Sequence, residues 1–416
     1  CPNSRAFDNP MMAVMRLVLL MASAVYLCDA SRFSSGGKKV EYYRNHPLTG
    51  STEHDRALIV IHGYGRNADD YYNSARQAQD VFPGVGTNTL VLAPWFKSED
   101  DNPLADELYW STAGWSKGED SLDGQEFSSF AVADGLLESI SSRFPNVTEV
   151  VIAGHGAGAQ FVQRYAGIGV VPDIRCDIRV RYVVANPGSY MFPTAERPRS
   201  TSGCDNEGQG GSLFLGGSSD EYTMGEEGVD ACPSGTSIIT DPDKCSDAAT
   251  YVDVQYKSYE SDLEVGETGL CVVKNIGKPS LRVTMTAKHG CSAAWLCEVG
   301  AVSTYDRYKY GISDLPNALN YTSLSITKIQ RNLVDREVFL LLGTADNSRV
   351  VSPAPDISCE ADAQGLHRYE RGINYRNDVK ALDCSARTTV TKVPGVGHYH
   401  RDMFISPQGI MALFIG

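Results

Sequence analysis

The feature that most constrains the fold is a set of five short apolar runs separated by longer mixed segments. The runs are residues 57–61, 90–93, 149–153, 182–185 and 338–342. None of them alternates polar and apolar residues, which is typical of parallel strands buried on both faces. Apolar residues recur at helical spacing between the runs, for example over 128–144. The sequence therefore predicts an α/β fold with a mostly parallel central sheet flanked by helices.

In such sheets the ligand site lies at the carboxyl ends of the strands, so the residues directly after each run are the first candidates. The first run ends in His-Gly-Tyr-Gly at 62–65, and the third leads through a glycine-rich turn at 154–158 into a helical segment. Asp346 follows the fifth run, and His398 follows a strand-like segment at 388–391. We expect these groups to meet at one edge of the sheet.

The turn at 154–158 matches the flanking positions of the pattern G-x-S-x-G, which carries a nucleophile on a sharp turn from strand to helix. Gly154 and Gly158 supply the small flanking residues, with His155 and Ala157 between. Gly156 occupies the middle position, where the pattern has serine. The alternative is a phosphate-binding turn, but neither a Lys-Ser/Thr pair nor a G-x-G-x-x-G completion follows.

These residues carry a specific resemblance. The chain resembles a secreted α/β-hydrolase family of bacteria and microbial eukaryotes whose elbow reads GHSAGGQ before a helix containing RYA. Here the corresponding residues are GHGAGAQ at 154–160 and RYA at 164–166. Further matching landmarks lie at 108–110, 186–190, 308–311, 364–365 and Arg368. The resemblance runs from about residue 42 to the C-terminus, interrupted by a cysteine-rich insertion.

The resemblance implies a serine-esterase site for carboxylic esters. In that site Asp346 orients an imidazole, His398 is the general base, and the backbone N–H groups of Tyr64 and Ala157 form the oxyanion hole. The resemblance implies no cofactor, and the sequence has no metal-ligand cluster of the HExxH kind. Trp110 and Trp115 are expected to line the pocket beside Tyr64, and a small ester or a carbohydrate-like molecule is the expected ligand.

Each candidate also has a common structural interpretation, since an isolated Asp346 is often a turn residue and an isolated His398 a loop residue. His400 is the other base candidate, and it fits the family pattern less well. The side chain of His155 is expected to point away from the nucleophile position. Only their order along the chain, each behind a strand, makes the catalytic interpretation specific.

The glycine at 156 leaves four interpretations open. The protein is a pseudoenzyme that binds a ligand in the old pocket, or its serine was lost through engineering or sequence error and the natural protein is an active esterase. Alternatively, His398 activates water directly. The last interpretation is a non-enzymatic interaction protein that binds a partner through its cysteine-rich insertion. The first of these is favoured, because engineering usually replaces serine with alanine.

The composition and the N-terminus indicate an exported protein. Arg16 precedes an apolar segment at 17–28 and a small-residue cleavage site at 28–30, so residues 1–30 are interpreted as a leader plus signal peptide, with a buried helix as the alternative. The apolar segment is too short to span a membrane. The net charge of −14 argues against nucleic acid or an anionic membrane as the main partner. Sequons begin at Asn146 and Asn320.

The domain organisation follows from a change in composition. Residues 31–200 and 301–416 are predicted to form the hydrolase core, and residues 201–300 a disulfide-rich cap. This segment is rich in Gly, Ser and Asp, and its cysteines lie at positions 204, 232, 245, 271, 291 and 297. In the core, Cys359 and Cys384 are candidates for a further disulfide in an exported chain.

Overall fold

The computed structural model describes residues 30–199 and 304–415, apart from 36, 82–83, 85, 171–173, 316 and 351–352, and between these ranges it describes six strands. The predicted leader and signal peptide, up to residue 29, lie outside the described residues. The chain divides into two compact units, residues 1–202 with 305–416, and residues 203–304.

The first unit is built on an eight-stranded sheet in the order β1-β2-β4-β3-β5-β6-β13-β14. The strands β3 to β6, β13 and β14 run parallel, whereas β1 and β2 join the β4 edge antiparallel. The strands are β1 (Ala30–Ser35), β2 (Lys38–Arg44), β3 (Arg56–Ile61), β4 (Thr89–Pro94), β5 (Glu149–His155), β6 (Arg179–Ala185), β13 (Glu337–Gly343) and β14 (Thr389–Val393). This mostly parallel sheet confirms the predicted fold class.

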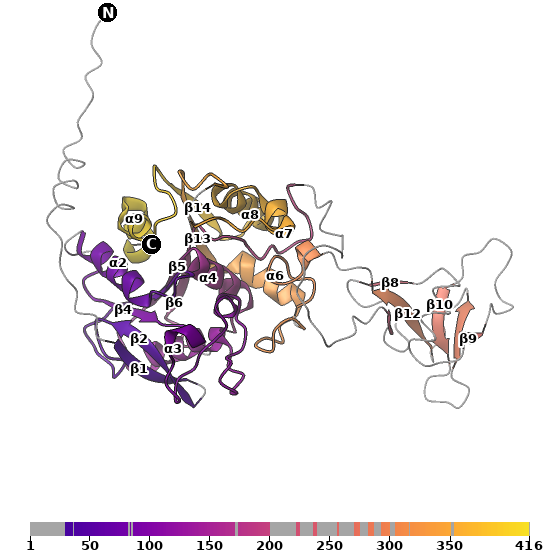
Figure 1. Ribbon diagram of the computed structural model, residues 1–416, viewed down its shortest axis with the longest axis horizontal. Coiled ribbons are helices and arrows are strands. Elements are labelled where there is room, and N and C mark those ends of the chain that lie inside the picture. The colour runs from indigo at the N-terminus through magenta and orange to yellow at the C-terminus, as the bar shows by residue number, and fades with distance from the viewer. Residues whose placement is uncertain are drawn as a thin grey trace, which may run out of the picture. The chain divides into compact units, whose positions relative to one another are not determined.

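Helices cover both faces of this sheet (Figure 1). They are α2 (Ala68–Val81), α3 (Ser129–Arg143), α4 (Ala157–Ile168), α6 (Ile326–Asp335), α7 (Cys359–Gln364), α8 (Arg368–Leu382), α9 (His400–Ile405) and α10 (Pro407–Ile410). Short 3₁₀ turns are Glu99–Asp101, Gly114–Lys117 and Thr304–Asp306, and a π-helical turn, Met411–Ile415, ends the described chain. Among the described residues, no helix combines the length and apolarity needed to cross a bilayer.

The two faces explain why the strands are apolar throughout. Successive residues point to opposite sides of a strand, so Ile59 and Ile61 join one buried cluster while Leu58 and Val60 join the other. The first cluster contains residues of α3, α4 and α6, and the second contains residues of α2, α9 and α10. A strand buried on both sides has no face left for polar residues.

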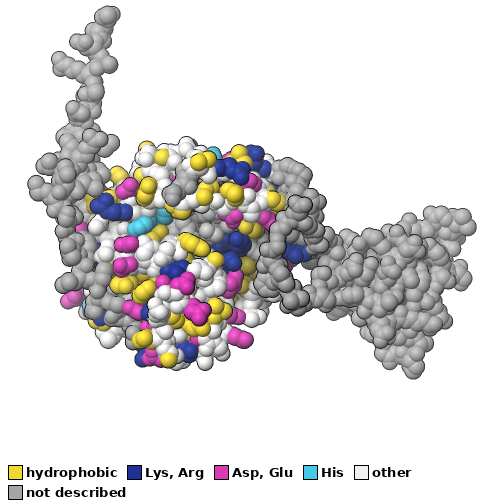
Figure 2. All heavy atoms as spheres, in the orientation of Figure 1, with side chains coloured by type: hydrophobic (Ala, Val, Ile, Leu, Met, Phe, Trp, Pro, Cys, Tyr) yellow, Lys and Arg dark blue, Asp and Glu magenta, His cyan; other side chains and the backbone are white. Residues whose placement is uncertain are grey.

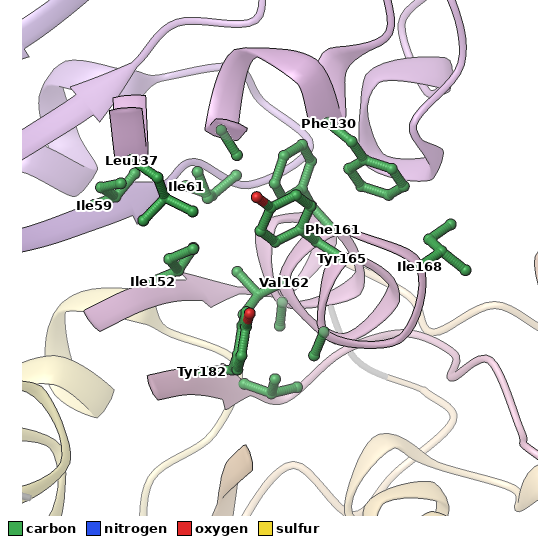
Figure 3. Close-up of a cluster of buried hydrophobic side chains, with 14 of the residues drawn as sticks. Ile59, Ile61, Phe130, Leu137, Ile152, Phe161, Val162, Tyr165, Ile168 and Tyr182 are labelled. Carbon is green, nitrogen blue, oxygen red and sulfur yellow. The ribbon is translucent and has the colours of Figure 1, made fainter. Parts of the chain in front are cut away.

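The helix that follows the glycine-rich turn, α4, is buried at every residue except Gln160. Phe161, Val162 and Tyr165 of α4 pack against side chains of β3, β5 and β6 and against α3 (Figure 3). Phe161 and Tyr165 are fully buried. This packing fixes the N-terminus of α4 at the carboxyl end of β5, which is where the sequence places the candidate site.

The second unit contains a six-stranded sheet, in the order β7-β12-β10-β11-β9 with β8 also paired to β12. Its strands are β7 (Tyr222–Met224), β8 (Thr236–Ile238), β9 (Tyr256–Lys257), β10 (Leu270–Lys274), β11 (Arg282–Thr286) and β12 (Ala293–Val299). All pairs are antiparallel except β9 with β11. The predicted cross-links among its cysteines lie outside the described residues, and its function as a cap stays a prediction.

Candidate active site

The chain reverses at Gly156, between the end of β5 and the start of α4. Gly156 has φ +60° and ψ −117°, a backbone conformation that side-chain-bearing residues rarely adopt. Its N–H donates a hydrogen bond to the carbonyl oxygen of Ala185 over 3.0 Å, which ties the turn to β6. The turn is therefore the sharp strand-to-helix elbow that the sequence predicts.

Close backbone approach explains the two flanking glycines. A Cβ atom on Gly154 would lie 2.3 Å from the carbonyl carbon of Gly158, and a Cβ on Gly158 would lie 2.3 Å from the carbonyl oxygen of Ile61. Gly156 differs from both, because a Cβ there would meet only the imidazole of His398, 3.2 Å from Nε2 and 3.5 Å from Cε1. A side chain at 156 would therefore meet a side chain that can shift rather than fixed backbone, and it would lie beside the predicted base.

His398 and Asp346 form the predicted pair. His398 Nδ1 lies 2.8 Å from Asp346 Oδ2, and the carboxylate is 1% exposed. Arg368 NH1 donates to the other carboxylate oxygen over 3.2 Å. Because Asp346 accepts from both sides, the Nδ1 of His398 carries a proton and its Nε2 is left as a free base facing position 156. Burial is the main reason that the pKa of His398 is lowered, so the imidazole is neutral at pH 7.

A buried histidine, His62, holds the loop at 62–65, which carries the predicted oxyanion donor Tyr64. Phe96 N donates to His62 Nε2 over 3.0 Å, so the proton of His62 is on Nδ1, which donates to the carbonyl oxygen of Gly63 over 2.9 Å. Burial lowers the pKa of His62 to about 4, so it stays neutral. Among the described residues, no acceptor is bonded to the backbone N–H of Tyr64 or of Ala157.

A cavity of about 700 Å³ opens over these groups. Tyr64, Gly156, Ala157 and His398 all line it, so the structure brings together the predicted base, oxyanion donors and nucleophile position. The rest of the wall comes from the loop at 353–356, from Gln160, Arg368 and Gly188, and from residues following β3 and β14.

The first unit's visible surface carries basic and acidic side chains intermingled (Figure 2).

The prediction that Trp110 and Trp115 line the pocket is wrong. Both side chains are fully buried and neither lines the cavity. Their indole N–H groups donate to the carbonyl oxygens of Phe127 and Thr112, over 3.1 Å each. The centroid of the Trp115 ring lies 4.4 Å from that of the His62 ring, so Trp115 packs against the histidine that holds the loop at 62–65. A buried indole whose N–H is satisfied by a carbonyl packs well in a core.

His155 is one of the residues that line the cavity. Its ring centroid lies 4.4 Å from that of His398, and its Nε2 has no hydrogen-bond partner among the described residues. His400 is a wall residue rather than the base. Its ring stacks on Tyr71, 4.0 Å between centroids, and its Nδ1 lies 3.1 Å from Ser74 Oγ.

Two further cavity residues escaped functional assignment from the sequence. Arg368 holds Asp346 and also donates to the carbonyl oxygens of Pro353 and Ala354, which fixes part of the cavity wall. Gln160 accepts from Arg164 NH2 over 3.0 Å through Oε1, so its side chain is held in place. Both lie in segments that match the family, yet nothing in the sequence indicates their partners.

The proposed pairing of Cys359 with Cys384 is wrong. Cys384 is an exposed free thiol, as is Cys176, whereas Cys359 is disulfide-bonded. The described part of the chain contains no group of three or more His, Cys, Asp or Glu side chains arranged to hold a metal ion.

No model of a protein family matches the chain, and no curated protein sequence does. Among solved structures, poly(aspartic acid) hydrolase-1 from Sphingomonas sp. KT-1 is similar with 19% sequence identity and a TM-score of 0.49, over 90% of this chain and 95% of that chain. The poly(3-hydroxybutyrate) depolymerase LpqC from Bordetella parapertussis matches with 16% identity and a TM-score of 0.48, over 93% and 89%. The mostly parallel sheet flanked by helices fits the α/β-hydrolase fold independently of these distant matches.

Proposed function

We propose that this protein is a carboxylic-ester hydrolase homologue that binds a small ester-type ligand in the cavity and is silent by the serine mechanism because residue 156 is glycine. One observation supports the proposal. A Cβ atom at position 156 would lie 3.2 Å from Nε2 of His398, whose Nδ1 lies 2.8 Å from Asp346 Oδ2.

The chemistry that is missing follows from this geometry. In a serine enzyme the hydroxyl gives its proton to the imidazole as its oxygen attacks the ester carbonyl carbon, and the leaving alcohol then takes that proton. The acyl group stays on the serine until water hydrolyses it. Here His398 can take a proton and the N–H groups of Tyr64 and Ala157 can hold an oxyanion, but residue 156 has no oxygen to attack.

The test compares the protein with its Gly156→Ser variant, using p-nitrophenyl butyrate as the substrate. Removing a triad serine can cost about 10⁶-fold in turnover, so restoring one is expected to raise turnover by at least about 10³-fold. Gly124→Ser is the matched control, because Gly124 also has a positive φ, of +86°, and a Cβ there has open space around it. This control must stay as inactive as the parent.

A fluorophosphonate probe gives a second readout, because it reacts covalently only with an activated serine. We expect labelling of Gly156→Ser alone. Equal turnover by the glycine form would overturn the proposal and point to water activated directly by His398. A Gly156→Ser variant that folds but neither turns over nor becomes labelled would also overturn it, in favour of a purely structural or partner-binding function.

A further inference from the structure

We infer that the glycine form of the site binds a free carboxylate, the acid rather than the ester. One carboxylate oxygen lies on the N–H groups of Tyr64 and Ala157, and the other fills the space that a serine hydroxyl would occupy beside His398 Nε2. The inference rests on the proposed function for the location of the site. It goes beyond that function by naming the ligand class that the missing side chain favours.

The first argument is spatial. Apart from its two chain neighbours, a Cβ at position 156 would have only the His398 imidazole within 4 Å among the described residues, and Gly156 itself lines the cavity. An acyl group on a serine has one carbonyl oxygen and one ester oxygen on the same carbon. A carboxylate has two oxygens in the same arrangement, so its second oxygen takes the place of the absent serine oxygen.

The second argument concerns hydrogen bonds. The N–H groups of Tyr64 and Ala157 have no acceptor among the described residues, and Ala157 opens the twelve-residue helix α4, whose N-terminus favours an anion. In addition, His155 is 2% exposed, lines the cavity, and has an Nε2 atom without a partner in the described chain. A buried polar atom without a partner destabilises a structure, and a polar ligand group would satisfy it.

The third argument is the proton balance. The neutral His398 presents a lone pair at Nε2, and so does a carboxylate oxygen, so the two repel unless one proton lies between them. The complex therefore takes up one proton, which equals binding of the neutral acid. The charged or titratable groups that face His398 are the carboxylate of Asp346, the guanidinium of Arg368, and the imidazoles of His155 and His400. Burial lowers the pKa of both of these imidazoles, so they remain neutral and leave the proton to His398.

The experiment is an NMR titration of the parent protein with butyrate labelled with ¹³C at the carboxyl carbon. We expect saturable binding that tightens about tenfold per unit as the pH falls from 8 to 7, with one proton taken up. Methyl butyrate and butyramide, which carry no charge, should bind at least about tenfold more weakly in competition. Gly156→Ser should also lose at least about tenfold, since its hydroxyl fills the space, while Gly124→Ser binds as the parent does.

A second variant tests the proton. His398→Gln keeps a polar side chain of similar size and should bind butyrate with an affinity that no longer depends on pH between 7 and 8. Butyrate that fails to saturate the parent, or that binds equally well to Gly156→Ser, would overturn the inference. The proposed function and the inference can fail separately. If Gly156→Ser is an active esterase but the parent does not bind butyrate, only the inference is overturned. If the parent binds butyrate but Gly156→Ser is inactive, the inference is supported and the proposed function is overturned.

Discussion

The two sides of the site are built in different ways. On one side, the loops after β13 and β14 hold Asp346 and His398 through side-chain contacts, with Arg368 completing the set. On the other side, the elbow between β5 and α4 is held by its backbone, through the bond from Gly156 N to the carbonyl oxygen of Ala185 and the close approach around Gly158. The first side, the predicted acid–base side, therefore depends on side chains, whereas the elbow has glycine at its centre.

This difference shows what the identity of one side chain can and cannot change. The shape of the elbow depends on backbone contacts and not on the side chain at position 156. With glycine there, the turn and its N–H donors are therefore formed. The arrangement of His398, Asp346 and Arg368 depends on side-chain hydrogen bonds, so removing one of these side chains disrupts it. Substitutions on the predicted acid–base side should therefore lower activity, whereas substitutions in the elbow should lower the free energy of unfolding. The following variants separate these two effects.

The largest expected effect is on activity, in the Gly156→Ser background. Asp346→Asn should lower the esterase turnover of that variant by about 10⁴-fold, because an amide cannot hold the imidazole in the tautomer that leaves Nε2 free. The measurement is kcat with p-nitrophenyl butyrate. Asp55→Asn, at an exposed aspartate just before β3, is the control and should leave kcat unchanged. A loss of less than tenfold would show that Asp346 does not orient His398.

The next largest effect is on stability, and it is expected in the elbow rather than on the predicted acid–base side. Gly158→Ala should lower the free energy of unfolding by about 3 kcal/mol, because its Cβ would lie 2.3 Å from the carbonyl oxygen of Ile61 and 2.5 Å from that of His62. Gly156→Ala should cost only about 1 kcal/mol, since its Cβ would meet the movable imidazole of His398 at 3.2 Å rather than backbone, in addition to the cost of a positive φ. Urea unfolding followed by circular dichroism measures both. Equal losses would mean that the elbow is not held by close backbone packing.

What the sequence predicted well depends on backbone regularity. The apolar runs predicted the parallel strands because a strand buried on both faces has one composition along its whole length. Asp346 and His398 were found because the ends of parallel strands meet at one edge of the sheet. The strand β2 (Lys38–Arg44) gave no such signal, since it pairs antiparallel with β4 and its buried residues, Val40 and Tyr42, alternate with less buried ones.

What the sequence predicted poorly depends on where individual side chains point. Trp110 and Trp115 were expected in the pocket because aromatic residues suit a binding cleft, but the same rings suit a core once their N–H groups are paired. The expectation that His155 points away from the nucleophile position said nothing of its neighbours, and only the three-dimensional turn places its ring beside that of His398. The partner of Arg368 lies 22 residues away, and spacing alone cannot indicate it.

A smaller effect concerns the pH dependence of the acid–base side. Burial lowers the pKa of His398 below its ordinary value of 6.5, so the free base is present above that lowered pKa and is lost as the pH falls through it. In Gly156→Ser, kcat/KM should therefore be flat around pH 7 and fall only below pH 6.5. The measurement is a pH–rate profile from pH 4.5 to 8. An acid limb centred above pH 6.5 would show that the imidazole is not buried as described.

The smallest effect separates the two functions of Arg368. Its positive charge helps to lower the pKa of His398, so Arg368→Gln should raise that pKa and move the acid limb of Gly156→Ser upward by less than about one pH unit. Arg368→Lys keeps the charge but loses the fork that reaches both Asp346 and the carbonyl oxygens of Pro353 and Ala354. The lysine variant should therefore keep the pH limb and lose turnover. If both variants shift the limb equally, the arginine acts only through the shape of the loop, and the electrostatic contribution of the acid–base side is limited to Asp346.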